Sequence, residues 1–313
     1  MDTLINWTFL LLIMARPGRK TEIPSYKEIL DTIVQLPLNF HDYGLNMEIT
    51  NVPEVNDIKE SLCGGNDSQD VELYDGSGEV SKEFVLEHQA PVGQLHWNSN
   101  LVSKYDNPGN VNGMRWTSGT LISDDLLLTA GHSFDRFAGN FRVPLINGSD
   151  EKIPPPEIAT NMHVNFNYQF DSTGSLRQEQ SFQILELLEY RINNLDYAIV
   201  RLNGRPGQTF GHAKISESDA RLNDIICIIG HPQTLPKRLE AGHCTTLSEQ
   251  IIGYNDIDTL GGDSGSCILS RDSGKLVGVH TNGGCDVAHI GFNRGQRISF
   301  IIDASNILNS LNE

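Results

Sequence analysis

The chain has 313 residues, of which 38% are hydrophobic, so it can bury a sizeable core in one or two domains. Its 40 acidic residues outnumber its 23 basic residues and give a formal net charge of −17. This charge argues against nucleic acid as a partner, because phosphate binding requires clustered cations. No apolar run reaches the length of about 18 residues that a membrane span needs, and we predict none.

Residues 1–90 are predicted to form an N-terminal extension or prosegment that is partly helical and partly mobile. Residues 7–15 resemble the apolar part of a signal peptide, so secretion is one hypothesis, although no basic residue precedes them. The compartment is otherwise left open. A helix is expected over residues 26–36, where a capping box precedes apolar positions at helical spacing.

The acidic stretch at residues 48–79 holds nine acidic residues against one basic residue. Such a composition buries little apolar surface, and we expect this stretch to be extended or mobile. The alternative to a prosegment is therefore a solvated acidic linker.

Residues 91–313 show a different pattern, in which short apolar runs alternate with Gly, Asn, Asp and Pro. This pattern is typical of strands in a sandwich or barrel. Residues 140–180 include three consecutive prolines and are expected to form a long insertion with some strand content. Residues 300–311 place apolar side chains at helical spacing, which predicts a C-terminal helix packed on the barrel.

The cysteine count is odd, so at least one thiol is unpaired; the five are Cys63, Cys227, Cys244, Cys267 and Cys285. The pairing of the last four is left open, because burial as small apolar side chains is as good an explanation as a disulfide. No Cys-x-x-Cys pair occurs, and His231 and His243 have no third ligand at close spacing. We predict no metal and no cofactor.

One serine lies between glycines in the stretch of residues 259–266, just before an apolar run. The serine is Ser264, and glycines around it allow backbone shapes in which two N–H groups face one point. A serine hydroxyl attacks a carbonyl only with a base and with donors for the oxyanion. The pattern predicts a serine hydrolase in which the amides of Gly262 and Ser264 are the oxyanion donors.

The candidate base is His132, which follows an apolar strand and two small residues and so lies at a strand end beside a tight turn. The alternative is an ordinary loop histidine. Asp196 is the candidate group to orient the imidazole of His132. This carboxylate begins an apolar strand, where burying a lone charge is costly, so it requires a partner.

The resulting chain order is His132, Asp196, Ser264, which differs from the order in α/β-hydrolases. Those enzymes also carry a Gly-x-Ser-x-Gly motif around the nucleophile, which this chain lacks because residue 266 is serine. The chain resembles trypsin-like serine peptidases, and most nearly their glutamyl endopeptidase branch. The matching blocks are residues 129–132, 196–200, 261–266 and 278–284.

This resemblance covers roughly residues 92–305 and implies an all-β, chymotrypsin-like fold of two antiparallel six-stranded β-barrels with a C-terminal helix. It implies a serine endopeptidase in which Ser264 forms an acyl-enzyme, His132 transfers protons and Asp196 orients the histidine. We expect a polypeptide substrate and a monomer.

The resemblance also implies that Thr259 and His280 bind the substrate side chain before the scissile bond, with a preference for Glu or Asp. Imidazole and hydroxyl groups supply the donors that a carboxylate requires. The alternative is that His280 is a satisfied barrel histidine and Thr259 an ordinary loop residue.

Two departures from the family pattern are visible. Ser133 follows the histidine where animal trypsins usually carry a cysteine, so that disulfide is missing. Asp263 stands where trypsins use an aspartate to receive a new N-terminus, and a maturation cut within residues 75–92 is therefore one hypothesis. The alternative functions are a catalytically weak double-barrel binding module and a non-peptidase acyl hydrolase.

Overall fold

A computed structural model of the chain describes residues 62–285 and 291–311. The signal-like segment 7–15, the predicted helix 26–36 and the first part of the acidic stretch lie outside the described residues. No helix within the described ranges is long and apolar enough to cross a membrane.

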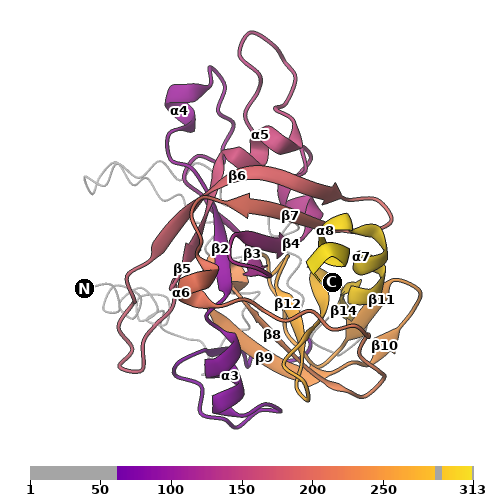
Figure 1. Ribbon diagram of the computed structural model, residues 1–313. Coiled ribbons are helices and arrows are strands. Elements are labelled where there is room, and N and C mark those ends of the chain that lie inside the picture. Colours follow the sequence, from indigo (N-terminus) through magenta and orange to yellow (C-terminus); the bar gives the residue numbers. More distant parts are fainter. Residues whose placement is uncertain (1–61, 286–290, 312–313) are drawn as a thin grey trace, which may run out of the picture. The chain divides into compact units, whose positions relative to one another are not determined.

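The first half of the described chain forms a closed six-stranded barrel in the order β2-β3-β4-β7-β6-β5 (Figure 1). All of its neighbouring strands are antiparallel. The strands are β2 (Val92–Trp97), β3 (Arg115–Leu121), β4 (Leu126–Thr129), β5 (Met162–Phe166), β6 (Gln180–Arg191) and β7 (Tyr197–Leu202). Register shifts in the long strand β6 let it curl around the barrel.

The second half forms an eight-stranded sheet in the order β1-β9-β8-β12-β13-β14-β11-β10. Its strands are β1 (Gln69–Asp70), β8 (Ile225–Gly230), β9 (Arg238–His243), β10 (Thr246–Leu247), β11 (Ile251–Tyr254), β12 (Cys267–Ser270), β13 (Leu276–Asn282) and β14 (Asn293–Arg297). The predicted all-β, chymotrypsin-like fold is confirmed. Its second unit is a curled eight-stranded sheet, to which the short strands β1 and β10 add the two edges.

Residues 140–180 contribute more to the barrel than the predicted insertion suggested. They contain helix α5 (Pro155–Thr160), the whole of β5 and the first residue of β6. Because β5 pairs with both β2 and β6, this segment closes the barrel. The polar residues His163 and Asn165 within β5 hid the strand pattern, although Asn165 is buried.

Residues 69–88 lie in the predicted extension and pack against the second sheet. Strand β1 pairs with β9, and helix α3 (Lys82–His88) begins at Ser81, whose hydroxyl accepts the amide of Phe84. The buried side chains of this segment share a core with Ile229 and other apolar residues of the sheet; they are Val71, Tyr74, Val80 and Val85. The acidic composition concealed these contacts, and the boundary at residue 90 stays a prediction.

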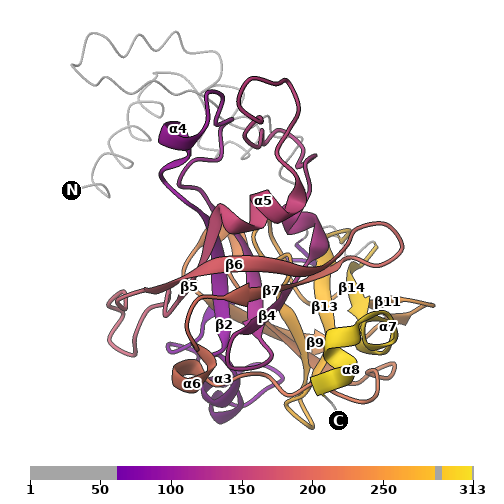
Figure 2. The same ribbon diagram turned by 45° about the horizontal axis from the view of Figure 1, so that its top comes forward.

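The predicted C-terminal helix is divided into α7 (Ile298–Ala304) and α8 (Asn306–Leu311), which Figure 2 shows beside the second sheet. Ser305 separates them: its amide donates to Ile302, and its hydroxyl accepts the amide of Leu308 at 3.0 Å. The remaining short helices are α4 (Leu101–Lys104), α6 (Gly207–Phe210) and the 3₁₀ turns η2 (Gly131–Phe134) and η3 (Pro232–Thr234).

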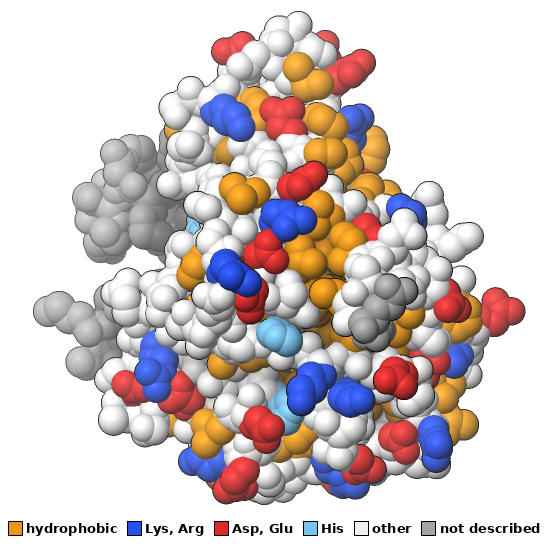
Figure 3. Space-filling model, in the orientation of Figure 1, with side chains coloured by type: hydrophobic (Ala, Val, Ile, Leu, Met, Phe, Trp, Pro, Cys, Tyr) orange, Lys and Arg blue, Asp and Glu red, His pale blue; other side chains and the backbone are white. Residues whose placement is uncertain are grey.

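Charged side chains of both signs are interspersed on the face seen in Figure 3, and apolar side chains gather near α8 and β7. A groove with both polar and apolar walls lies between α5, β6 and α8, lined by residues that include Pro155, Leu187, Leu188, Glu189, Tyr190, Arg191 and Ile307.

One disulfide is present, between Cys63 and Cys285, which are 222 residues apart in sequence. Cys227, Cys244 and Cys267 are free and buried, so they act as small apolar side chains.

Candidate active site

His132 and Asp196 are brought together by the pairing of β4 with β7. Thr129 at the end of β4 lies opposite Ala198, so the turn η2 that carries His132 meets the residue just before β7. Asp196 Oδ1 accepts the His132 amide at 2.9 Å, and Asp196 Oδ2 lies 2.6 Å from His132 Nδ1. A neutral imidazole held in this way carries its proton on Nδ1, which leaves Nε2 free to act as a base.

The serine loop reaches the same place from the second sheet. The Ser264 carbonyl accepts the Ser118 amide of β3 at 2.9 Å, and the Gly265 amide donates to the His280 carbonyl at 2.8 Å. Gly265 has φ +87°, and a Cβ there would lie 2.2 Å from the Thr129 hydroxyl. This glycine therefore lets the loop approach the strand end that leads to His132.

The half-buried Ser264 forms no side-chain hydrogen bond with any residue that the structure describes, His132 included. Catalytic hydrogen bonds are often long in the free enzyme and tighten on substrate binding. The amides of Gly262 and Ser264 also donate to no other group within residues 62–285 and 291–311. Two N–H groups beside the serine are thus available to an incoming acceptor.

Ser118 is a structural centre of this site that the sequence did not indicate. Its amide donates to Ser264, and its hydroxyl donates to the Gly262 carbonyl at 2.8 Å. The same hydroxyl accepts the His231 amide at 2.9 Å, and the Ser118 carbonyl accepts the Thr129 hydroxyl at 2.7 Å. Ser118 is fully buried and joins the first barrel to the carbonyl groups of the residues on either side of Asp263. Its partners Gly262 and His231 are 144 and 113 residues away, so no local pattern announces it.

His280 and Thr259, the predicted pocket residues, are both buried. His280 lies on β13, and the charges of His132 and Asp196 both influence its pKa, in opposite directions. Burial lowers the pKa of His280 to about 3, so its imidazole is neutral. Its Nδ1 is hydrogen-bonded to the hydroxyl of Tyr254 on β11, a buried residue that the sequence did not single out.

Thr259 contributes an unusual feature, because its hydroxyl is buried with no hydrogen-bond partner among the described residues. Buried polar groups in folded proteins are almost always paired. Thr259 therefore has a buried, unpaired hydroxyl at one of the two positions predicted to bind the substrate side chain.

Asp263 is buried, and its carboxylate accepts the amide of Leu260 at 3.0 Å. Burial raises the pKa of Asp263 to about 7. No Lys, Arg or His of the described residues forms an ion pair with it, so in this structure Asp263 is hydrogen-bonded rather than ion-paired.

The two histidines considered as metal ligands have protein partners. His231 bonds the Leu235 carbonyl, and His243 bonds Asp256 at 2.7 Å. Among the described residues, metal-ligand spacing is found for the carboxylates of Asp67, Glu240 and Asp258, which lie within 4.8 Å of one another. Burial, together with the neighbouring carboxyl groups of Asp67 and Asp258, raises the pKa of Glu240 to about 11, so Glu240 is protonated in this cluster.

The comparisons with known proteins agree with this architecture. The family model described as trypsin-like peptidase domain matches residues 117–279, just over half of the chain. The secreted RxLR effector protein 73 of Plasmopara viticola is 25% identical over 244 residues, which cover 74% of this chain and 53% of that protein. The chain thus spans about half the length of this relative.

Two solved structures are similar at low sequence identity. A Glu endopeptidase in complex with MPD has 19% identity and a TM-score of 0.48, and the match covers 72% of this chain and 89% of that one. A serine endoprotease from Yersinia pestis has 16% identity and a TM-score of 0.48, with 74% of this chain and 66% of that one covered.

Proposed function

This chain belongs to the trypsin-like peptidase domain family, and we propose that it is a serine endopeptidase that uses Ser264, His132 and Asp196. The observation that carries the proposal is the two-point contact between Asp196 and His132, in which one carboxylate binds both the backbone amide and Nδ1. His243 makes the same two-point contact with Asp256, whereas His132 lies just beyond the strand end that the Ser264 loop approaches through Gly265.

In the proposed reaction, His132 Nε2 removes the hydroxyl proton of Ser264 while Oγ attacks the scissile carbonyl carbon. The negative charge moves to the carbonyl oxygen, where the amides of Gly262 and Ser264 stabilise it. His132 then gives its proton to the leaving amine, and an acyl-enzyme remains. Water then attacks the ester while His132 Nε2 takes its proton, and His132 returns this proton to Ser264 Oγ as the acid product leaves. One oxyanion donor is typically worth about 3–4 kcal/mol of transition-state stabilisation.

We further propose a preference for Glu or Asp before the scissile bond. Burial raises the pKa of Tyr254, so its phenol is neutral, and His280 Nδ1 is the acceptor that its hydroxyl contacts in the described structure. The proton of the neutral His280 ring is then on Nε2. An Nε2–H donor and the unpaired Thr259 hydroxyl are suitable partners for a substrate carboxylate.

A serine-reactive fluorophosphonate tests the enzyme class. Wild type should be labelled at Ser264, whereas Ser264→Ala should be unlabelled and inactive. Absence of label on folded wild type would favour a binding module. Labelled protein that hydrolyses small esters but no member of a peptide library would be a non-peptidase acyl hydrolase.

Matched peptides that differ only before the cleaved bond test the preference. Peptides with Glu should be cleaved faster than those with Gln, Lys or Phe, and Thr259→Val should reduce this advantage because it removes the hydroxyl and keeps the shape. Faster cleavage after Lys, Arg or Phe would refute the acidic preference and leave the triad proposal intact.

We also propose that the enzyme acts in an oxidising compartment after export. Disulfides such as Cys63–Cys285 persist in secreted proteins and are rare in reducing compartments. Tagged protein should accumulate outside the producing cells with this bond formed. Retention inside the cells with both thiols free would contradict this proposal.

A further inference from the structure

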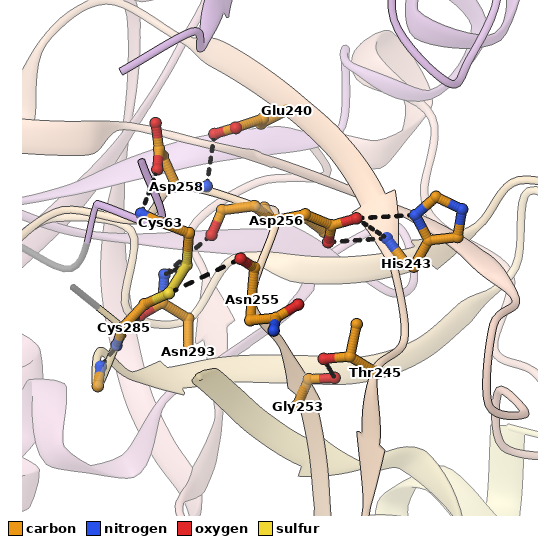
Figure 4. The surroundings of a disulfide bond; sticks show 12 residues. Cys63, Glu240, His243, Thr245, Gly253, Asn255, Asp256, Asp258, Cys285 and Asn293 are labelled. Atoms are coloured by element: carbon orange, nitrogen blue, oxygen red, sulfur yellow. Dashed lines mark hydrogen bonds and ion pairs between the residues drawn. A yellow bond between two sulfur atoms is a disulfide. The ribbon is translucent and has the colours of Figure 1, made fainter. Parts of the chain in front are cut away.

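The first described residues of the chain are attached to two connections between strands of the second sheet, around the disulfide that Figure 4 shows. Cys63 forms the disulfide with Cys285, which follows β13 by three residues. The Cys63 amide also donates to Asp258 Oδ1 at 2.6 Å, and the Asp67 amide donates to Asp258 Oδ2 at 3.3 Å. One short N-terminal segment, residues 63–67, therefore contacts both places.

Each attachment point is close in sequence to a pocket residue. Asp258 immediately precedes Thr259, and its own amide is held by Glu240 Oε2 at 2.8 Å. Cys285 lies five residues after His280 and three residues beyond the end of the strand that carries this histidine. A displacement of either attachment point is transmitted directly along the backbone to Thr259 or His280.

Asn293 on β14 connects the same three segments. It is fully buried, and its amide nitrogen donates to the Ile257 carbonyl at 2.9 Å and lies 3.4 Å from Cys63 Sγ. Its side-chain oxygen accepts the amides of Gly284 and Cys285 at 3.0 and 3.1 Å. One buried side chain thus spans the Thr259 side, the His280 side and the N-terminal segment.

We propose that residues 63–67, attached through the Cys63–Cys285 disulfide and Asp258, are a fixed part of the substrate pocket that sets the positions of Thr259 and His280. This inference rests on the proposed peptidase function. These residues are positioning residues, because they act through the pocket walls. The stretch that the sequence assigned to a removable extension is here a component of substrate recognition.

The test is steady-state kinetics of the full chain on the peptide that wild type cleaves fastest, together with the rate of fluorophosphonate labelling. The double variant Cys63→Ser/Cys285→Ser removes the covalent attachment and leaves no free thiol there. Asp258→Asn keeps the disulfide and weakens the contacts with the two amides. We expect KM to rise about tenfold or more in the double variant while kcat and the labelling rate change less than about threefold. Asp258→Asn should give a smaller change of the same kind.

Tyr74→Phe is the matched control. Tyr74 belongs to the same N-terminal part of the chain, and its hydroxyl donates to the Val80 carbonyl at 2.8 Å, away from the pocket residues. This variant should lose stability with KM unchanged.

The outcomes are distinguishable. Unchanged KM in both pocket variants would overturn the inference, and so would a parallel fall of kcat, labelling and melting temperature, which indicates a merely structural role. Wild type that is folded yet unlabelled would overturn the peptidase proposal, and this inference with it.

Discussion

The side-chain hydroxyl of Ser118 is the most informative group to remove, because it joins the loop that carries Ser264 to His231, the residue just before the turn η3. In Ser118→Ala, the His231 amide and the Gly262 carbonyl each lose a partner that lies within 2.9 Å. The backbone contacts of residue 118 with Ser264 and Thr129 remain. The substitution therefore tests the hydroxyl alone.

The size of the effect follows from these two orphaned groups. A buried polar group left unpaired costs about 1–3 kcal/mol, so with two such groups the free energy of unfolding should fall by about 2–6 kcal/mol. The Gly262 carbonyl belongs to the peptide unit next to the one that carries the oxyanion amide. If about half of one donor's 3–4 kcal/mol is lost through misalignment, kcat falls about 10–30-fold.

The assay combines denaturant unfolding with kcat and KM measured well below the melting temperature. Ser216→Ala is the matched control, because Ser216 is also buried and its hydroxyl also bridges a carbonyl and an amide, both of Ser218. The control should lose stability and keep kcat. A Ser118→Ala enzyme that loses stability but keeps kcat within about twofold of wild type would refute our reasoning.

Three further predictions concern the same region. Gly262→Ala should abolish activity, because Gly262 has φ +110° and a Cβ there would lie 2.4 Å from the His231 carbonyl oxygen; an active, normally folded variant would contradict this loop geometry. Burial raises the pKa of Asp263 from 3.8 to about 7, so its stabilising contribution is complete below about pH 4 and is lost as pH rises through 7. Asp263→Asn should flatten the plot of melting temperature against pH between about pH 4 and 7, and an unchanged slope would count against this role of Asp263. Any maturation cut within residues 75–92 should leave the fragment that contains Cys63 linked to the enzyme until a reductant is added, as gels with and without reductant will show; release without reductant would be inconsistent with the disulfide.

The sequence indicated the strands and the order of the chemical groups well. Runs such as residues 126–129 and 197–200 are continuously apolar, and both are buried strands of the barrel. His132 and Asp196 each flank such a run, and the pairing of these two strands brings the residues together. The sequence could predict these positions because each depends on neighbouring residues: the end of a strand fixes where the side chains that follow or precede it lie.

The acidic composition of residues 48–79 was misleading for its described part. Val71 and Tyr74 lie within it and are buried, although most of their neighbours are polar. Net composition describes the exposed face of a segment, while a few apolar side chains decide whether it packs.

What the sequence determined by itself is therefore the class of fold, since apolar patterning is a property of neighbouring positions, and from residue chemistry it predicted a set of reactive groups. The tertiary structure alone decided which groups hold that set in place. Ser118, Tyr254 and Asn293 are ordinary polar residues of strands, and their partners are distant in sequence. The partner of Cys63 is likewise set by packing, because the distance between two cysteines in space is fixed only once the sheet has formed.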